Sequence, residues 1–181
     1  GIDSLENDGT GRNYGVELTV EKFYSKGYYF LWTTSLYRAY CTPADKIERQ
    51  TAFSGNYVVN LLGGKEFKLN TKNTLAFDIK MNAAGGKRYI PIDLVNSGLS
   101  GFPVYDFSHA YENRYPGYFR IDAKIGYIHN GKHVTQQWSV EFLNATNHKN
   151  VFSQAYDEST NTTFYNYQTG LLIVPSFKIS F

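Results

Sequence analysis

Hydrophobic and polar residues alternate along most of this chain with a period of two. In the stretch 11–23, charged Glu17 and Glu21 fall on one side of an extended backbone. The other side carries Tyr14, Val16, Leu18 and Val20. Because successive side chains of a strand point to opposite faces of a sheet, this pattern predicts a strand with one apolar and one polar face.

The same alternation recurs in six further stretches, and no stretch has a convincing helical period. These stretches are residues 27–40, 53–69, 73–84, 118–129, 134–144 and 171–181. In the second of the seven stretches, Tyr28, Phe30 and Trp32 share the face that would meet lipid if the sheet lay in a membrane. The pair Gly63-Gly64 interrupts the third stretch and predicts a bulge or bend there. The chain is therefore expected to be all-β and antiparallel, with seven or eight strands.

In two of the predicted strands, charged side chains keep to one face, even at mid-strand. In residues 73–84 and 118–129 one face carries no charge, and the other carries Asp78, Lys80, Arg120, Asp122 and Lys124. A lysine or arginine facing lipid at the bilayer midplane costs about 2 to 4 kcal/mol. In a transmembrane barrel these side chains would face a watery or ion-paired interior, whereas in a sandwich they would face bulk solvent.

The connections between predicted strands alternate strictly between short and long. The short ones are residues 24–26, 70–72 and 130–132, and the long ones are residues 41–52, 85–117 and 145–168. Barrels of the bacterial outer membrane have short periplasmic turns and long extracellular loops. The alternation therefore favours a transmembrane barrel over a Greek-key sandwich. The last stretch, residues 171–181, is about as long as a strand that crosses a bilayer.

Composition adds an aromatic surplus and little net charge. Aromatic residues make up 17% of the 181 residues, which suits the aromatic girdles of a membrane barrel or a carbohydrate-binding surface. A net charge of +2 gives no electrostatic reason to expect a nucleic acid partner. The single cysteine, Cys41, excludes an internal disulfide, and the sequence contains no run of 18 apolar residues that would form a membrane helix.

Catalytic and metal-binding patterns are absent from the sequence. There is no Ser-His-Asp set in a recognisable context and no nucleophile elbow. His129 and His133 flank the 130–132 turn without a third ligand at a suitable spacing, and the acidic residues of the loops are best interpreted as solvated side chains. We therefore expect a protein that is not an enzyme and has no cofactor and no bound metal.

Several segments, taken together and in order, resemble one family of membrane proteins. They are GRNYGVELTVEKF, FSGNYVVNLLGGKEFKL, AGGKRYIPID, YFRIDAKIGY, NATNHKNVFSQAY and the terminal VPSFKISF. This set resembles the last third of the barrel of TonB-dependent outer-membrane receptors of the Bacteroidetes type, the SusC-like proteins and their relatives. The resemblance covers nearly the whole chain.

The resemblance implies a function and a set of partners. Such receptors are 22-stranded barrels in the bacterial outer membrane, closed around an N-terminal plug, that import a nutrient such as a glycan or a siderophore. Residues 1–181 would then be the C-terminal portion of the barrel, with the plug and the earlier strands outside this sequence. The implied partners are outer-membrane lipid, the TonB energy-transducing system acting through the plug, the barrel-assembly machinery and a surface substrate-binding lipoprotein. The family's assembly signal corresponds here to Phe177, Ile179 and Phe181.

The longest connection is where we expect ligand recognition. It mixes aromatic and polar residues, a composition suited to stacking on sugars or closing over a ligand. The candidate ligand-binding residues are Tyr89, Phe102, Tyr105, Tyr111 and Tyr115. The alternative for these rings is that they only pack the loops against each other. Two alternatives also stand for the whole chain: a small self-closed eight-stranded barrel with a structural or adhesive role, and a soluble carbohydrate-binding β-sandwich.

Overall fold

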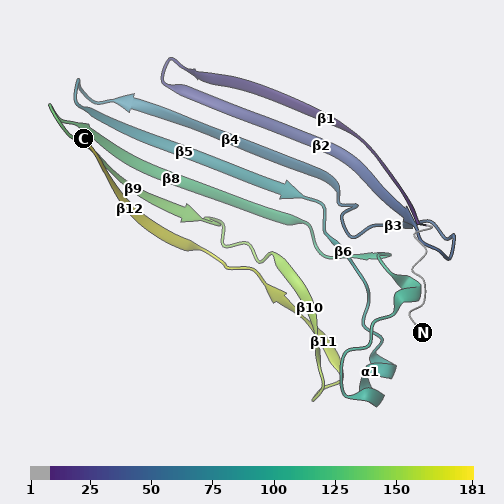
Figure 1. Ribbon diagram of the computed structural model, residues 1–181. Coiled ribbons are helices and arrows are strands. Elements are labelled where there is room, and N and C mark those ends of the chain that lie inside the picture. Colours follow the sequence, from purple (N-terminus) through teal and green to yellow (C-terminus); the bar gives the residue numbers. More distant parts are fainter. Residues whose placement is uncertain (1–8) are drawn as a thin grey trace.

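The computed structural model describes residues 9–181 and shows an all-β protein built around one antiparallel sheet (Figure 1). Seven long strands follow each other in the order β1-β2-β4-β5-β8-β9-β12, and the short β3 pairs with β2. Their bounds are β1 (Thr10–Ser25), β2 (Tyr28–Thr42), β3 (Arg49–Gln50), β4 (Asn56–Lys68), β5 (Asn73–Ala84), β8 (Tyr118–Asn130), β9 (Thr135–Leu143) and β12 (Leu172–Ser180). All seven stretches with the alternating pattern are strands of this sheet.

The long connections contain structure of their own. Two small antiparallel pairs are formed by β6 (Arg88–Tyr89) with β7 (Asn113–Arg114) and by β10 (Val151–Asp157) with β11 (Thr162–Tyr167). The connection between β6 and β7 also holds α1 (Leu94–Ser100) and the 3-10 helix η1 (Phe107–His109). No helical period is visible in the sequence at α1, which is only seven residues long, and the chain is all-β as predicted. The β10–β11 hairpin lies in a region that the alternation pattern left as a plain connection.

Short turns and long loops lie at opposite ends of the sheet (Figure 1). We call these the turn end and the loop end. At the turn end, β1 and β2 are joined by Lys26 and Gly27 alone, with φ angles of 54° and 79°. Two successive positive φ angles are the requirement of a type I′ turn, whose twist matches that of the strands it joins. The predicted alternation of short and long connections is confirmed.

The register of the strands gives the sheet one face on which apolar residues predominate, which we call the apolar face. Across the middle of the sheet, Val20, Trp32, Leu61, Met81 and Ile121 are successive neighbours on this face. The opposite, polar face carries every carboxylate of the seven strands, namely Glu17, Glu21, Glu66, Asp78, Asp122 and Glu141. Sequence patterning and strand register therefore agree along the whole sheet.

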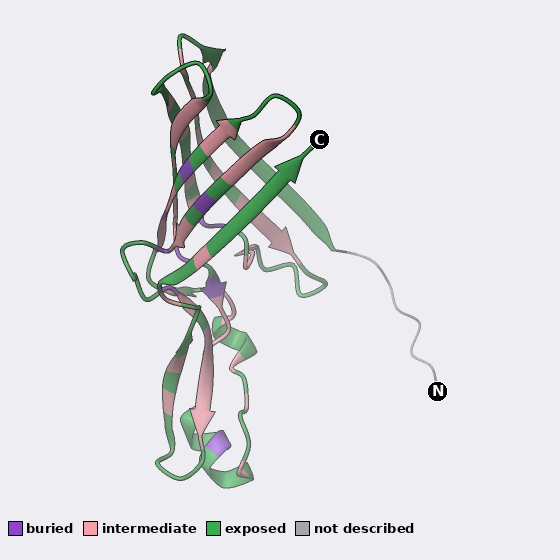
Figure 2. Cartoon of the chain, turned by 90° about the vertical axis from the view of Figure 1, so that its left-hand side faces the viewer, coloured by how far each residue is buried: buried purple, intermediate pink, exposed green. Residues whose placement is uncertain are grey.

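The burial of the two faces is the reverse of that in a water-soluble protein. No hydrophobic side chain is buried among the described residues, whereas Asp122 and Ser139 on the polar face are only 7% and 8% exposed. On the apolar face, Trp32 is 41% exposed and Phe177 54%. Figure 2 shows buried residues confined to a few short patches of the cartoon. No second sheet packs on the apolar face, so within residues 9–181 the fold is a single layer and not a sandwich.

The polar face is held together by hydrogen bonds between neighbouring strands. Asn82 Nδ2 donates to Asn60 Oδ1 at 2.6 Å, and Asn60 Nδ2 donates to Thr33 Oγ1 at 3.1 Å. Tyr29 Oη donates to Asp78 Oδ1 at 2.8 Å. These bonds supply partners for polar groups that lie away from bulk water.

The bulge expected at Gly63-Gly64 does not form, because the register with both neighbouring strands runs without interruption through these residues. Gly64 instead makes room for a contact. A Cβ at this position would lie 2.5 Å from Tyr29 Cε1 and would also overlap the Asp78 carboxylate. The absent side chain lets the Tyr29 ring cross β4 to reach Asp78 on the far side.

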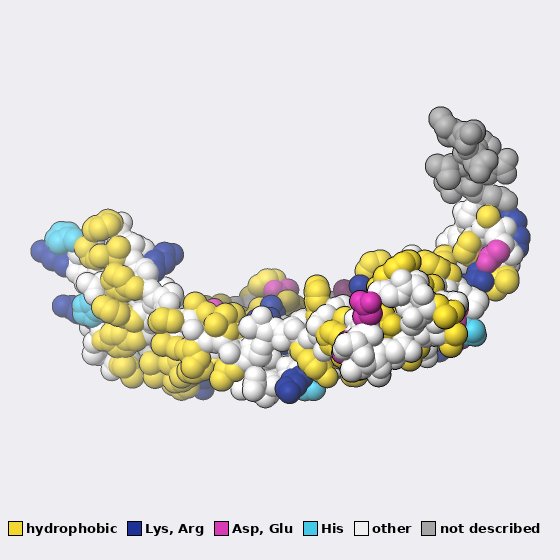
Figure 3. Space-filling model, turned by 90° about the horizontal axis from the view of Figure 1, so that it is seen from below, with side chains coloured by type: hydrophobic (Ala, Val, Ile, Leu, Met, Phe, Trp, Pro, Cys, Tyr) yellow, Lys and Arg dark blue, Asp and Glu magenta, His cyan; other side chains and the backbone are white. Residues whose placement is uncertain are grey.

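The sheet is open. β1 pairs only with β2, and β12 pairs only with β9, so each has one edge without a partner among the described residues. Figure 3 shows the molecule as an arc and not as a ring. The self-closed small barrel is therefore not formed. Among residues 9–181 there is no helix long and apolar enough to cross a membrane.

Candidate functional site

Side chains from three connections, half of them aromatic, surround a cleft at the loop end. The cleft has a volume of about 420 Å³. Ala52 comes from the β3–β4 connection, and the other residues come from the β5–β8 connection and from β10. The lining residues are Ala52, Lys87, Arg88, Tyr89, Ile90, Tyr105, Phe107, Tyr111, Tyr115, Phe152, Ser153 and Gln154.

Four of the five residues that the sequence singled out line this cleft. Tyr89, Tyr105, Tyr111 and Tyr115 lie in its wall, although up to 26 residues of chain separate them. Phe102 is not part of the lining and is 60% exposed just beyond α1. That these rings bind a ligand stays a prediction. The structure brings the four tyrosines together and leaves Phe102 apart.

The rings are stacked in an ordered way. Tyr89 and Tyr115 lie face to face, with ring centroids 4.4 Å apart and an interplanar angle of 13°. Tyr165 of β11 meets Tyr115 edge to face at 5.7 Å. The backbone N–H of Gln154 donates to Tyr115 Oη at 3.0 Å. Tyr115 is therefore fixed on one side by a stacked ring and on the other by the β10–β11 hairpin.

Two polar atoms of the cleft lack hydrogen-bond partners. Arg88 is only 7% exposed, and its Nη1 donates to the carbonyl oxygens of Tyr111 at 2.7 Å and Glu112 at 2.9 Å. Its Nε is buried without a partner, as is Oε1 of Gln154. Buried polar atoms without partners are rare in folded proteins. Both residues line the cleft, although these two atoms are themselves shielded from solvent.

Burial also sets the charge state of the cleft. It raises the pKa of the Tyr89 hydroxyl above its ordinary value, with a further contribution from Tyr165. Burial likewise raises the pKa of Tyr115. The pKa of Arg88 is lowered, first by burial and then by the nearby Arg114, yet a guanidinium stays charged at any physiological pH. At neutral pH the Tyr89 and Tyr115 hydroxyls are therefore neutral and lie in the same wall as the charged guanidinium of Arg88.

The helix α1 lies in a loop whose two ends are held together by hydrogen bonds. The Asp93 side chain accepts hydrogen bonds from the backbone N–H groups of Val95 and Asn96 and so caps the helix. The fully buried Ser97 accepts a hydrogen bond from the Val104 N–H at 2.9 Å. A Cβ at Gly98 would lie 3.1 Å from the Asn161 side chain, so the helix touches the β10–β11 turn. This closure places Tyr105 back beside the cleft.

Two buried asparagines fix the hairpin to the sheet. Asn150 donates its side-chain N–H to Phe119 O and accepts from Phe119 N, both at 2.8 Å. Asn144 is 2% exposed; its side-chain N–H groups donate to the carbonyls of His148 and Thr169, and its backbone N–H donates to Asp122. The alternation of hydrophobic and polar residues could not reveal these roles, because they belong to single residues outside the strands.

Outside the cleft, the loop acids bond to their own neighbours. Asp106 accepts hydrogen bonds from Ser108 and from His109 Nδ1, which lowers the pKa of Asp106 to about 2 and raises that of His109. Among the described residues no three His, Cys, Asp or Glu side chains lie close enough together to hold a metal ion.

The residues of the expected assembly signal lie at the turn end of the sheet's last strand. Phe177 and Ile179 are on the apolar face of β12, where Phe177 pairs with Trp138. Phe181 follows the strand and is 96% exposed. Their role in assembly stays a prediction.

Comparison of the chain with protein families, with curated proteins and with solved structures found no match. The case for a function therefore rests on the faces of the sheet and on the loop-end cleft.

Proposed function

We propose that this chain forms part of the wall and the extracellular loops of a transmembrane β-barrel in the bacterial outer membrane. The observation that carries the proposal is the reversed burial of the sheet. Its apolar face is exposed and uncovered, and its polar face holds the carboxylates and the buried polar groups. A bilayer is the solvent in which such an apolar face is stable without a second layer of protein.

The apolar face is banded as a membrane surface would be. Near the loop end it carries Tyr14, Tyr40 and Tyr57, and near the turn end Phe67, Tyr127, Trp138 and Phe177. On β4, ten residues separate Tyr57 from Phe67. At about 3.4 Å per residue and a tilt of roughly 40°, this separation spans about 26 Å along the membrane normal. That is the height of the apolar band of outer-membrane barrels, about 25 Å.

Trp32 shows how a polar group on the apolar face can be accommodated in hydrocarbon. It lies between the two aromatic bands, and its indole N–H donates to Thr34 Oγ1 at 2.8 Å on the same strand. An indole N–H in lipid has no water to bond, so a partner within the chain avoids the cost of an unpaired donor.

The open edges support membership of a larger barrel. Within residues 9–181, β1 and β12 each have a row of backbone groups without a partner, and such rows are costly in lipid. We propose that strands outside this sequence pair with both edges. The complete protein would then be a TonB-dependent receptor of about 22 strands that imports a nutrient such as a glycan or a siderophore. In it, the loop-end cleft would capture the nutrient, and the TonB system would drive its release inward through the plug.

Labelling of neighbouring positions on β4 tests the membrane orientation. In the full-length protein with Cys41 replaced by serine, we expect a nitroxide at Leu61→Cys to be more accessible to oxygen, which dissolves in lipid, than to a water-soluble nickel chelate. A nitroxide at Leu62→Cys, on the polar face, should be shielded from the lipid. Ready access of the nickel chelate to position 61 would exclude lipid contact and favour a soluble protein.

Replacement of a cleft tyrosine tests nutrient capture. In the full-length receptor, Tyr115→Ala removes a stacked ring and is expected to lower uptake at limiting nutrient concentration by about tenfold, the equivalent of one lost aromatic contact. Phe102→Ala is the control, because this loop aromatic lies outside the cleft and is 60% exposed. Equal uptake by wild type and Tyr115→Ala would argue that the rings only pack the loops.

A further inference from the structure

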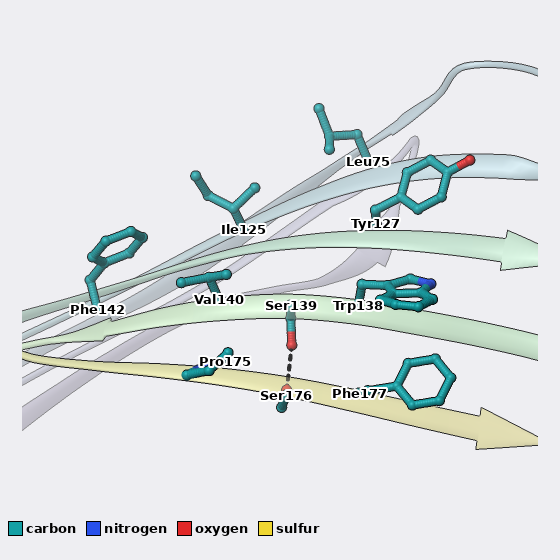
Figure 4. Close-up of a pocket in the computed structure, with 10 residues that line it drawn as sticks. All are labelled: Leu75, Ile125, Tyr127, Trp138, Ser139, Val140, Phe142, Pro175, Ser176 and Phe177. Atoms are coloured by element: carbon teal, nitrogen blue, oxygen red, sulfur yellow. Dashed lines mark hydrogen bonds between the residues drawn. The ribbon is translucent and has the colours of Figure 1, made fainter.

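A shallow groove runs across the apolar face near the turn end. It consists of two apolar hollows of about 690 and 660 Å³ that share Ile125. The first is lined by Tyr28, Phe30, Lys65, Phe77 and Ile79 among others. The second continues over β9 and β12 (Figure 4). We call the two together the apolar-face groove.

Aromatic rings border the groove on the side of the turns. In Figure 4, Ile125, Val140 and Pro175 lie across the middle of the second hollow, with Tyr127, Trp138 and Phe177 beside them. The rings of Trp138 and Phe177 are 4.5 Å apart. In the second hollow the groove thus has a floor of aliphatic side chains just inside the aromatic band.

Two lysines line this groove: Lys124 belongs to the polar face, where its register partner is Asp78, whereas Lys65 belongs to the apolar face and has no acidic partner there. The seven long strands have no carboxylate on their apolar face, and among the described residues the only contact of the Lys65 ammonium is with the Phe67 ring, 4.9 Å away. Lys22, on the same face, differs: its ammonium lies 3.8 Å from the Tyr28 ring and bonds to Ser25 and to backbone carbonyls. A lysine on a lipid-facing surface is stabilised when its head reaches the interface and meets an anion.

Lysines outnumber acids at the turn end. The lysines are Lys22, Lys26, Lys65, Lys68, Lys72, Lys124, Lys132 and Lys178, and the acids are Glu21, Glu66, Asp78 and Glu141, all four on the polar face. Figure 3 shows the basic side chains gathered at the left tip of the molecule. Anionic lipid headgroups attract such clusters of lysine.

We infer that the apolar-face groove is a binding site for an anionic phospholipid, whose acyl chain lies along Ile125 while Lys65 holds its phosphate. The inference rests on the proposed membrane location. Both parts of the ligand have a counterpart: the apolar floor accepts hydrocarbon, and the ammonium is a point charge of the kind that binds phosphate. A neutral lipid would leave Lys65 without an anion.

Native mass spectrometry of the full-length protein tests this site. The protein is delipidated in detergent and titrated with phosphatidylglycerol or with phosphatidylcholine carrying the same acyl chains. We expect wild type to prefer phosphatidylglycerol and Lys65→Gln to weaken its binding by about tenfold, as for the loss of one charge-assisted hydrogen bond. Lys68→Gln is the control, because it removes the same charge from the same strand on the polar face.

Three results would overturn the inference: no preference for the anionic lipid, unchanged binding by Lys65→Gln, or equal losses in both variants. If Lys65→Gln does not fold, Lys65→Arg keeps the charge and should retain the preference, and loss of that preference would contradict the site. The nitroxide at position 61 separates the two proposals. If the nitroxide contacts lipid but Lys65 has no role in binding, only the phospholipid site is refuted. If the nitroxide contacts water, the membrane location is refuted as well.

Discussion

Leu61→Lys is expected to lower the free energy of unfolding by about 2 to 4 kcal/mol, the cost of a lysine facing lipid near the bilayer midplane. Leu61 lies on the apolar face between Trp32 and Met81, far from either aromatic band. No carboxylate shares this face of the long strands, so the new ammonium would have no partner. The measurement is urea-induced unfolding of the full-length protein in lipid vesicles.

Leu31→Lys provides a matched control at nearly the same depth. Leu31 belongs to the polar face of β2, and its register partner on β1 is Glu21. The same substitution there places an ammonium opposite a carboxylate, and we expect a loss below about 1 kcal/mol, since opposite charges across strands are favourable. Equal losses for the two variants would contradict the assignment of the apolar face to lipid.

Asn144→Ala is expected to cost about 3 kcal/mol and to loosen the β10–β11 hairpin. The substitution removes the hydrogen bonds to His148 and Thr169 from a site that is 2% exposed, and buried groups left unpaired cost about 1 to 3 kcal/mol. It also leaves alanine at a φ of 50°, a left-handed conformation that costs about 1 to 2 kcal/mol. Unfolding in vesicles measures the loss, and hydrogen exchange of residues 151–167 reports the hairpin.

Glycine at the same position separates the two causes. Asn144→Gly loses the side-chain hydrogen bonds but tolerates the positive φ, so it should be more stable than Asn144→Ala by about 1 kcal/mol. If both variants match wild type in stability and in exchange, Asn144 does not anchor the hairpin. A loss in Asn144→Ala that Asn144→Gly restores completely would assign the whole effect to backbone strain.

The strands could be predicted from sequence because one physical constraint acts along their entire length. Each strand of the sheet must present an apolar residue to the same face at every second position, so the pattern survives even where Lys65 or Gly63 interrupts it. The hairpin β10–β11 obeys no such constraint. It packs on loops, and single contacts hold it in place: the anchors at Asn144 and Asn150 and the hydrogen bond from Gln154 to Tyr115.

The helix α1 could not be predicted from the sequence, for a related reason. Seven residues make barely two turns, too few to show a period, and closure by Ser97 and Val104 supports the helix in place of an amphipathic face. The candidate cleft was predicted in part. Tyrosines in a long loop are visible in a sequence, whereas the pairing of Tyr115 with Gln154, 39 residues away, depends on the fold.

Within residues 9–181 the outer edges of β1 and β12 have no partner strand, and this determines how the chain behaves without the other strands of the proposed barrel. β1 is 16 residues long and carries few charged side chains on its apolar face, so its edge is a ready template for a strand of another copy. Expressed alone in water, residues 1–181 would self-associate by strand addition before any side-chain packing could stop it. Refolding yields would then depend on protein concentration and on the moment at which lipid is supplied.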